Sequence, residues 1–225
     1  MRIAKRIKHI TIVLLALLTS SCEQDYDNYR YPSVVTDYAC LLTNSVGKIE
    51  HMHLDNGRTY PVNFTDEFLD TYNSQEPIYK ADTLYRAISV YELGTNGNET
   101  IANIYSLGSI VSSVPTTLPV GKKLYQDPVY LQSIWLSGGY LNFILEVKAL
   151  NGKHSIGYID TTPKGMNGKE FTFYHQVVND VESYRQKLYG SIPLSPFEEL
   201  LQPKDTLRFV INLYDKGITE HLFIL

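Results

Sequence analysis

The sequence predicts an all-β protein of two β domains, because its apolar residues mostly alternate with polar ones. Such alternation is typical of strands that bury one face against a core. Tyrosine, which favours strands and half-buried surfaces, occurs 18 times among the 225 residues. Hydrophobic residues make up 44% of the chain, which is enough to build real cores.

The first predicted domain covers residues 36–113. Five alternating segments predict strands at 36–44, 47–54, 58–64, 83–93 and 99–107. The Asn56-Gly57 pair indicates a tight hairpin turn between the second and third of them. Between the third and the fourth, aromatic residues recur at a spacing of four and predict a short helix: Phe64, Phe68 and Tyr72. Three strands, one helix and two strands is the element order of an OB-type small barrel.

The second predicted domain covers residues 129–225 and follows a linker at 114–128 that contains three prolines. About seven strands are expected, the number of an immunoglobulin-like β-sandwich. Inward-facing apolar residues alternate along one of them: Leu141, Phe143, Leu145, Val147 and Ala149. A turn at 151–153 predicts a hairpin between this strand and the segment 154–160. Ser195, Pro196 and Glu198 predict a capped helical turn.

The N-terminus has the layout of a secretory signal peptide. Four basic residues precede a run at 10–18 that is almost wholly apolar and too short for a permanent membrane span of roughly 20 residues. We therefore expect residues 1–21 to be an export signal; the alternative is a buried core helix. The segment from Leu18 to Cys22 resembles the lipobox of bacterial lipoproteins, although Thr19 stands where leucine is usual. The resemblance implies that Cys22 is acylated and anchors the chain to a membrane.

Residues 22–35 are polar and predict a tether. Its first part, "EQDYD", resembles the acidic signal that sends lipoproteins to the cell surface in Bacteroidetes, and a solvated spacer is the other reading. Removal of the signal leaves 16 basic residues against 24 acidic ones, a net charge near −8. This charge disfavours nucleic acid as a partner. Cys40 then has no cysteine to pair with, and we expect an inert, buried thiol.

The chain as a whole resembles the NigD-like lipoproteins of Bacteroidetes. The segments that carry the resemblance are "LDNGRTYPV" (54–62), "DTLYRAISVYEL" (82–93), "GGYLNFILEV" (138–147) and "YGSIPLSPFEELLQPKDTLRFVINLYD" (189–215). The resemblance implies a lipobox, an N-terminal OB-like domain and a C-terminal β-sandwich. It implies no activity, because the family takes its name from a gene that lies beside a bacteriocin gene.

Two histidines are the candidate metal ligands. His51 and His53 lie two residues apart on a predicted strand and therefore point to the same face. Glu50 and Asp55 are nearby carboxylates, but they fall at odd offsets from this pair, and no third ligand stands at a recognisable spacing. A solvated polar face is the favoured reading, and we expect no metal and no cofactor.

Catalytic patterns are missing from the sequence. No G-x-S-x-G motif occurs, and Ser191 falls in a predicted strand. Glu198 and Glu199 are adjacent and diverge on a helix, so they are poor candidates for a glycosidase pair. Five aromatic residues are candidates for a sugar- or peptide-binding face or for core packing: Trp135, Tyr140, Tyr158, Tyr184 and Tyr189.

Three functions remain in consideration. The first is a non-enzymatic lipoprotein, anchored in the outer membrane and exposed at the cell surface or facing the periplasm, which binds a protein or glycan partner. The second is a bacteriocin-immunity or envelope-protection lipoprotein. The third is an envelope hydrolase with an active site that no motif reveals. A patch of exposed aromatic residues would favour the first, and a pocket with converging titratable groups would favour the third.

Overall fold

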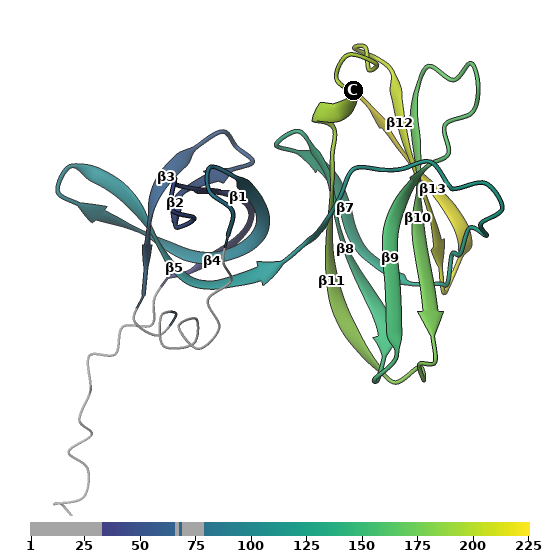
Figure 1. Cartoon of the computed structure of the whole chain (residues 1–225), viewed down its shortest axis with the longest axis horizontal. Coiled ribbons are helices and arrows are strands. Elements are labelled where there is room, and N and C mark those ends of the chain that lie inside the picture. Colours follow the sequence, from purple (N-terminus) through teal and green to yellow (C-terminus); the bar gives the residue numbers. More distant parts are fainter. Residues whose placement is uncertain (1–32, 66–67, 69–78) are drawn as a thin grey trace, which may run out of the picture. The chain divides into compact units, whose positions relative to one another are not determined.

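The computed structural model describes residues 33–65, 68 and 79–225. Val34–Leu225 form one compact unit, whose strands are labelled in Figure 1. The predicted export signal, Cys22 and almost all of the predicted tether lie outside the described residues. Of the three aromatic residues that predicted a short helix, Phe64 lies at the end of a strand, Phe68 is buried, and Tyr72 lies outside the described residues. Within the described residues, no helix is long and apolar enough to cross a membrane.

The first five strands close into a barrel, which confirms the predicted fold of this half. They are β1 (Val35–Thr43), β2 (Ile49–Leu54), β3 (Thr59–Phe64), β4 (Leu84–Asn96) and β5 (Glu99–Ser109). Their order around the barrel is β1-β2-β3-β5-β4, and β1 pairs with β4 to close it. All neighbours are antiparallel except β3 and β5, which run parallel.

The barrel core is made by the alternate residues that the strand pattern predicts. Along β4, Ala87, Ser89 and Tyr91 are buried in the barrel, while Arg86 lies on the opposite face. Small and medium side chains fill the centre, and several of them are almost fully buried: Ala39, Leu41, Met52, Ala102 and Ile104. The narrow interior is therefore a packed core.

The remaining strands form a sandwich of two four-stranded sheets (Figure 1). They are β6 (Val111–Ser112), β7 (Tyr130–Ser137), β8 (Tyr140–Ala149), β9 (Lys153–Asp160), β10 (Gly168–Val178), β11 (Tyr184–Pro193), β12 (Thr206–Leu213) and β13 (Gly217–Ile224). One sheet has the order β6-β11-β8-β7 and the other β13-β12-β10-β9. Phe143, from the first sheet, stacks on Phe209 from the second and meets Phe173 edge to face. These rings form the centre of a buried apolar core.

The predicted hairpin between 140–149 and 154–160 is wrong. β8 pairs with β7 on one side and with β11 on the other, so neither of its edges is free for β9. The turn at 150–152 instead carries the chain across to the other sheet, where β9 pairs with β10. A turn signal in the sequence marks a reversal of the chain and does not reveal which sheet the next strand enters.

Three further segments differ from their simplest sequence reading. β6 falls inside the range assigned to the first domain, yet it pairs with β11 of the sandwich. Thr116 and Gln126, in the predicted linker, form β-bridges to β9 and β10. The turn after β11 is a short 3-10 helix, Ser195–Phe197, whose N-cap is Leu194 without a side-chain cap bond. The predicted capping box is therefore absent, because the helix begins one residue too early for Ser195 to cap it.

Candidate functional site

One flank of the sandwich is open where the edges of its two sheets face each other. β11 pairs with β8 along its whole length, but on its other side it pairs with β6 only at Gly190 and Ser191. Among the described residues, no strand pairs with that second side at 184–189. Across the gap, the only described pairing on the outer side of β9 is the single bridge from Ile159 to Thr116.

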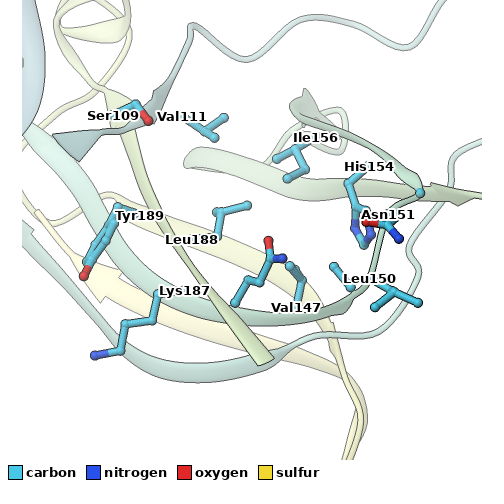
Figure 2. A pocket seen from close by; sticks show the side chains of 13 residues that line it. Ser109, Val111, Val147, Leu150, Asn151, His154, Ile156, Lys187, Leu188 and Tyr189 are labelled. Atoms are coloured by element: carbon cyan, nitrogen blue, oxygen red, sulfur yellow. The ribbon is translucent and has the colours of Figure 1, made fainter. Parts of the chain in front are cut away.

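A cavity of about 450 Å³ occupies this opening, and we call it the aperture. Figure 2 shows the side chains of Val111, Val147, Ile156 and Leu188 around a common space, while Lys187 and Tyr189 point away from it. Polar groups join this lining, among them Ser109, Asn151, His154 and Gln186. Its volume lies within the range of about 300–1,000 Å³ that is usual for binding pockets.

β11 supplies one wall of the aperture through its strand alternation. Leu188 and Gln186 lie on the face that turns toward the sandwich interior, two and four residues before Gly190. A Cβ at Gly190 would collide with the ring of Phe143, so the interior is closed at that level. Closer to Gln186, the inward face of β11 becomes exposed. In the described residues, no strand extends β6 along this part of β11.

Three polar side chains make a chain of hydrogen bonds at the aperture. His175 Nδ1 lies 2.9 Å from the backbone oxygen of Asp127, and His175 Nε2 lies 2.9 Å from His154 Nδ1. His154 Nε2 lies 2.8 Å from Oδ2 of Asp180. The Asp180 carboxylate also accepts backbone N–H bonds from Leu150 and Asn151. It is therefore surrounded by donors, with its side chain only 2% exposed.

The number of protons that these hydrogen bonds need is set by the two acceptors at the ends of the series, the backbone oxygen of Asp127 and the carboxylate of Asp180. A carbonyl oxygen and an ionised carboxylate accept hydrogen bonds and donate none. His175 Nδ1 and His154 Nε2 must both carry a proton to donate to these acceptors. Two neutral imidazoles hold only two protons, so the contact between the rings is a hydrogen bond only when one of them is protonated.

Electrostatics perturb His175 and Asp180, which stand at the two ends of this series. Burial lowers the pKa of His175, and its contact with His154 lowers it further, against the bond to Asp127, which raises it. The hydrogen bond from His154 holds the pKa of Asp180 far below its ordinary range, together with the backbone N–H groups around it. Both ring nitrogens of His154 are thus committed, and neither can act as a general base toward Ser109.

A second polar cluster surrounds Arg86, whose side chain is 3% exposed. Its guanidinium donates to both oxygens of Asp55, at 2.5 and 2.7 Å, and to Asn142 Oδ1 at 3.0 Å. Its Nε donates to Ser191 Oγ at 3.2 Å, and its plane lies 4.1 Å from the ring centre of Tyr140. Burial lowers the pKa of Arg86. The hydrogen bonds and charges of Asp55 and Cys40 raise that pKa by more, so the guanidinium stays charged.

This Arg86 cluster joins residues of the barrel to residues of the sandwich. Arg86 and Asp55 belong to the barrel half, whereas Asn142 and Ser191 lie on β8 and β11. Sequence alternation placed Asn142 on an outward face, and it does lie there, but it is fully buried. Such a paired and hydrogen-bonded ion pair is a structural contact.

The histidines predicted as metal candidates are separated from the aperture. His51 lies 3.8 Å from Glu50, and His53 bonds to Thr59 Oγ1 at 2.7 Å. Asp55, which could have joined them, is held by Arg86. Among the described residues, no group of three or more His, Cys, Asp or Glu side chains could hold a metal ion.

The five aromatic candidates do not form one face. Tyr158 is buried in the sandwich core. Trp135 and Tyr189 both pack edge to face against Tyr38, with ring centres 5.1 and 6.2 Å apart. Tyr140 lies under Arg86, and Tyr184 is 54% exposed.

The remaining candidate residues from the sequence either make structural contacts or lie on the surface away from the aperture. Ser191 is buried and donates to Asn142 at 2.7 Å. Cys40 is half-buried beside the Tyr140 hydroxyl and Arg86, so it is less buried than expected. Glu198 and Glu199 are exposed.

The aperture was missed by sequence reasoning, and so was its histidine pair. His154, His175 and Asp180 come from β9, from β10 and from the loop after β10, with no spacing that matches a motif. The signal that could have suggested the opening is the shortness of the apolar run at 110–111, which cannot cover a ten-residue strand.

Solved structures resemble the chain along most of its length. One is a NigD-like immunity protein from Bacteroides caccae ATCC 43185, with 26% identity, a TM-score of 0.68, and coverage of 87% of this chain and 99% of that one. A protein from Parabacteroides distasonis ATCC 8503, described as a candidate toxin-related protein, has 16% identity and a TM-score of 0.64, covering 85% and 93%. A candidate lipoprotein from Bacteroides fragilis NCTC 9343 has 9% identity and a TM-score of 0.57, covering 85% and 97%.

The last two likenesses, at their low identities, show the fold alone. No curated protein matches the chain. The family model of the NigD-like C-terminal beta sandwich domain matches residues 112–224, which is half of the chain. These residues contain all of the strands of the sandwich except for Val111, the first residue of β6. The chain therefore belongs to the NigD-like family.

Proposed function

We propose that this protein is a non-catalytic lipoprotein, anchored in the outer membrane through Cys22, and that it binds a partner molecule in the aperture. The observation that carries the binding role is a cavity lined by both aliphatic and polar side chains, beside a histidine pair whose hydrogen bonds are already made. His154, His175 and Asp180 bond to one another and to the backbone, so none of these three is free to act as a base beside the cavity. A site built this way can hold a ligand, but it offers no activated nucleophile.

The anchor is supported by the sequence ahead of the barrel. A basic head, a short apolar run and the lipobox-like Leu18 to Cys22 precede the first strand. Several acyl chains at about 0.8 kcal/mol per buried methylene would hold the folded part firmly on a membrane. The acidic residues after Cys22 favour display at the cell surface over retention in the periplasm.

Three measurements test the anchor, the exposure at the cell surface and the binding role. In intact cells, the native protein should partition into detergent as a processed lipoprotein, and the variant Cys22→Ser should be released or remain unprocessed. Protease added to intact cells should degrade the native protein if it faces outward. A Cys22→Ser protein that still partitions as the mature lipoprotein would refute the anchor. The binding role requires that the anchored protein retain a partner when it is isolated from cross-linked cells.

A second candidate function is immunity to a bacteriocin. The observation that favours it is the match to the NigD-like immunity protein of Bacteroides caccae, which is covered over 99% of its length at 26% identity. Deleting the gene and challenging the cells with bacteriocins from neighbouring strains tests this idea. Higher sensitivity, restored by the native gene, is the expected result. Unchanged sensitivity to all of them would remove immunity and leave the general binding role.

A further inference from the structure

The open side of β11 carries backbone groups without a strand to pair with in the described part of the chain. In an antiparallel pair, alternate residues direct their N–H and C=O groups to the partner and the residues between them direct theirs away. β11 pairs with β8 from Tyr184 to Pro193. About half of the residues at 184–189 therefore direct their backbone groups toward the aperture. An unpaired strand edge of this kind is a template for another strand.

The fold already places one strand in this position. β6 pairs parallel to β11, Val111 opposite Gly190 and Ser112 opposite Ser191. β5 ends at Ser109, which belongs to the barrel sheet and pairs with Ala87 there. The position beside β11 is thus filled at one end by two residues and is open beside Gln186. An added strand would continue an existing interface of this sheet.

The side-chain lining fits an extended polypeptide. Successive side chains of a strand point to opposite faces, so one side chain of an added strand would enter the space between the sheets. There it would meet the aliphatic groups of Val111, Val147, Ile156 and Leu188, which Figure 2 shows around the cavity. The cavity of about 450 Å³ has room for a branched aliphatic side chain.

We propose that the aperture binds an extended, apolar peptide segment of a partner protein as an added strand beside β11. This inference rests on the proposed binding function and specifies its partner. Main-chain hydrogen bonds to the open side of β11 would supply affinity, and the aliphatic floor would select the side chain that enters. A glycan fits less well, because the one aromatic ring in the lining, Tyr189, points away from the cavity (Figure 2).

Gln186 offers a way to block the site without touching the core. Its side chain is exposed at the mouth of the aperture, so Gln186→Trp should fill the mouth and leave the fold intact. The matched control is Gln132→Trp, because Gln132 is an exposed glutamine on β7, at the opposite edge of the same sheet. Both variants change the same residue type, and thermal unfolding of each checks that the fold is kept.

The experiment selects random dodecapeptides, displayed on phage, against the full chain made soluble by Cys22→Ser. Selected peptides should contain a run of alternating aliphatic residues. Their affinity should fall at least tenfold with Gln186→Trp and stay within twofold of the parent with Gln132→Trp. N-methylation of alternate peptide bonds should weaken binding by a similar factor. Binding should also slow amide hydrogen exchange in β11 at alternate residues between 184 and 189.

Several outcomes would overturn the inference. They are the selection of no peptide, peptides that Gln186→Trp does not weaken, and peptides that protect no amide of β11. Binding of oligosaccharides from an array, blocked by Gln186→Trp, would assign the aperture to a glycan instead. The proposed function fails separately, when the anchored protein retains no partner from cross-linked cells. A partner that is retained equally by Gln186→Trp would keep the binding function and refute the aperture as its site.

Discussion

Arg86→Met is the substitution for which the structure gives the clearest magnitude. Methionine keeps much of the apolar stem of arginine but removes the charge that pairs with Asp55. The two bonds of 2.5 and 2.7 Å to Asp55 are lost, as are those to Asn142 and Ser191. Breaking a buried ion pair by removing one partner costs about 3–5 kcal/mol. The Asp55 side chain is 15% exposed and can regain some water, so we expect the lower end, about 3 kcal/mol.

The assay is thermal unfolding at neutral pH, followed by calorimetry. For a domain of roughly 150–250 residues, 1 kcal/mol shifts the midpoint by about 2–4 °C, so Arg86→Met should lower it by about 6–12 °C. Because the cluster joins the barrel to the sandwich, its loss should also separate a single transition into two. Adding Asp55→Leu should restore part of the stability, since the unpaired carboxylate is then gone.

The control is Arg185→Met. Arg185 is 56% exposed and lies 3.3 Å from Glu146, so its loss should cost less than about 1 kcal/mol. Equal midpoints for the two variants, or a midpoint for Arg86→Met within 2 °C of the native protein, would refute the reasoning that the Arg86 cluster stabilises the fold.

Two further predictions concern the sandwich. In the folded protein, the pKa of His175 lies below its ordinary value of 6.5. As the pH falls below 6.5, the unfolded chain therefore binds more protons than the folded protein does, and the free energy of unfolding should decrease. Asp180, whose pKa is also lowered, adds stability above its ordinary value of 3.8 that is lost as the pH falls further. Urea titrations between pH 7.5 and 2.5 check both effects, and a constant midpoint would contradict them. Gly190→Ala should destabilise the sandwich by about 1–3 kcal/mol, because its Cβ would collide with the Phe143 ring. Combining it with Phe143→Leu should recover part of the loss in the same titration, and an unaltered midpoint for Gly190→Ala alone would count against this packing.

The barrel was predictable because its signals are local. Alternation along β1 and β4, the Asn-Gly turn before β3 and the turn at 95–98 each act within a few residues. The order of strands around the barrel is less local, because β5 lies between β3 and β4 and pairs with both. Strand alternation puts Arg86 on the face opposite Ala87, but its partners on β8 and β11 lie 56 and 105 residues away in the sequence.

The sandwich was predictable in its strands and not in its pairing. The run from Tyr140 to Ala149 is apolar at most residues of its first half, where both faces of the strand are buried at Leu141, Asn142 and Phe143. A hairpin with β9 was nevertheless expected, because pattern alone does not show that both edges are already taken. The aperture arises from the same global property: it exists because β6 has two residues and β11 has ten.

The histidine pair could not be predicted for a different reason. His154 and His175 come together only because β9 and β10 pair with His175 opposite Ile156 and Val177 opposite His154. Asp180 joins them from the loop after β10. Without the register of these strands, three residues of ordinary types at irregular spacing carry no signal.

The most direct test of the account is a photo-cross-linking experiment on the anchored protein in intact cells. A photoreactive amino acid is placed at position 186, at the mouth of the aperture, and in a parallel strain at position 132, on the far edge of the same sheet. The account predicts that light attaches a discrete protein at position 186 and not at position 132. Cross-links of equal yield and identity at both positions, or at position 132 alone, would contradict the aperture as the binding site.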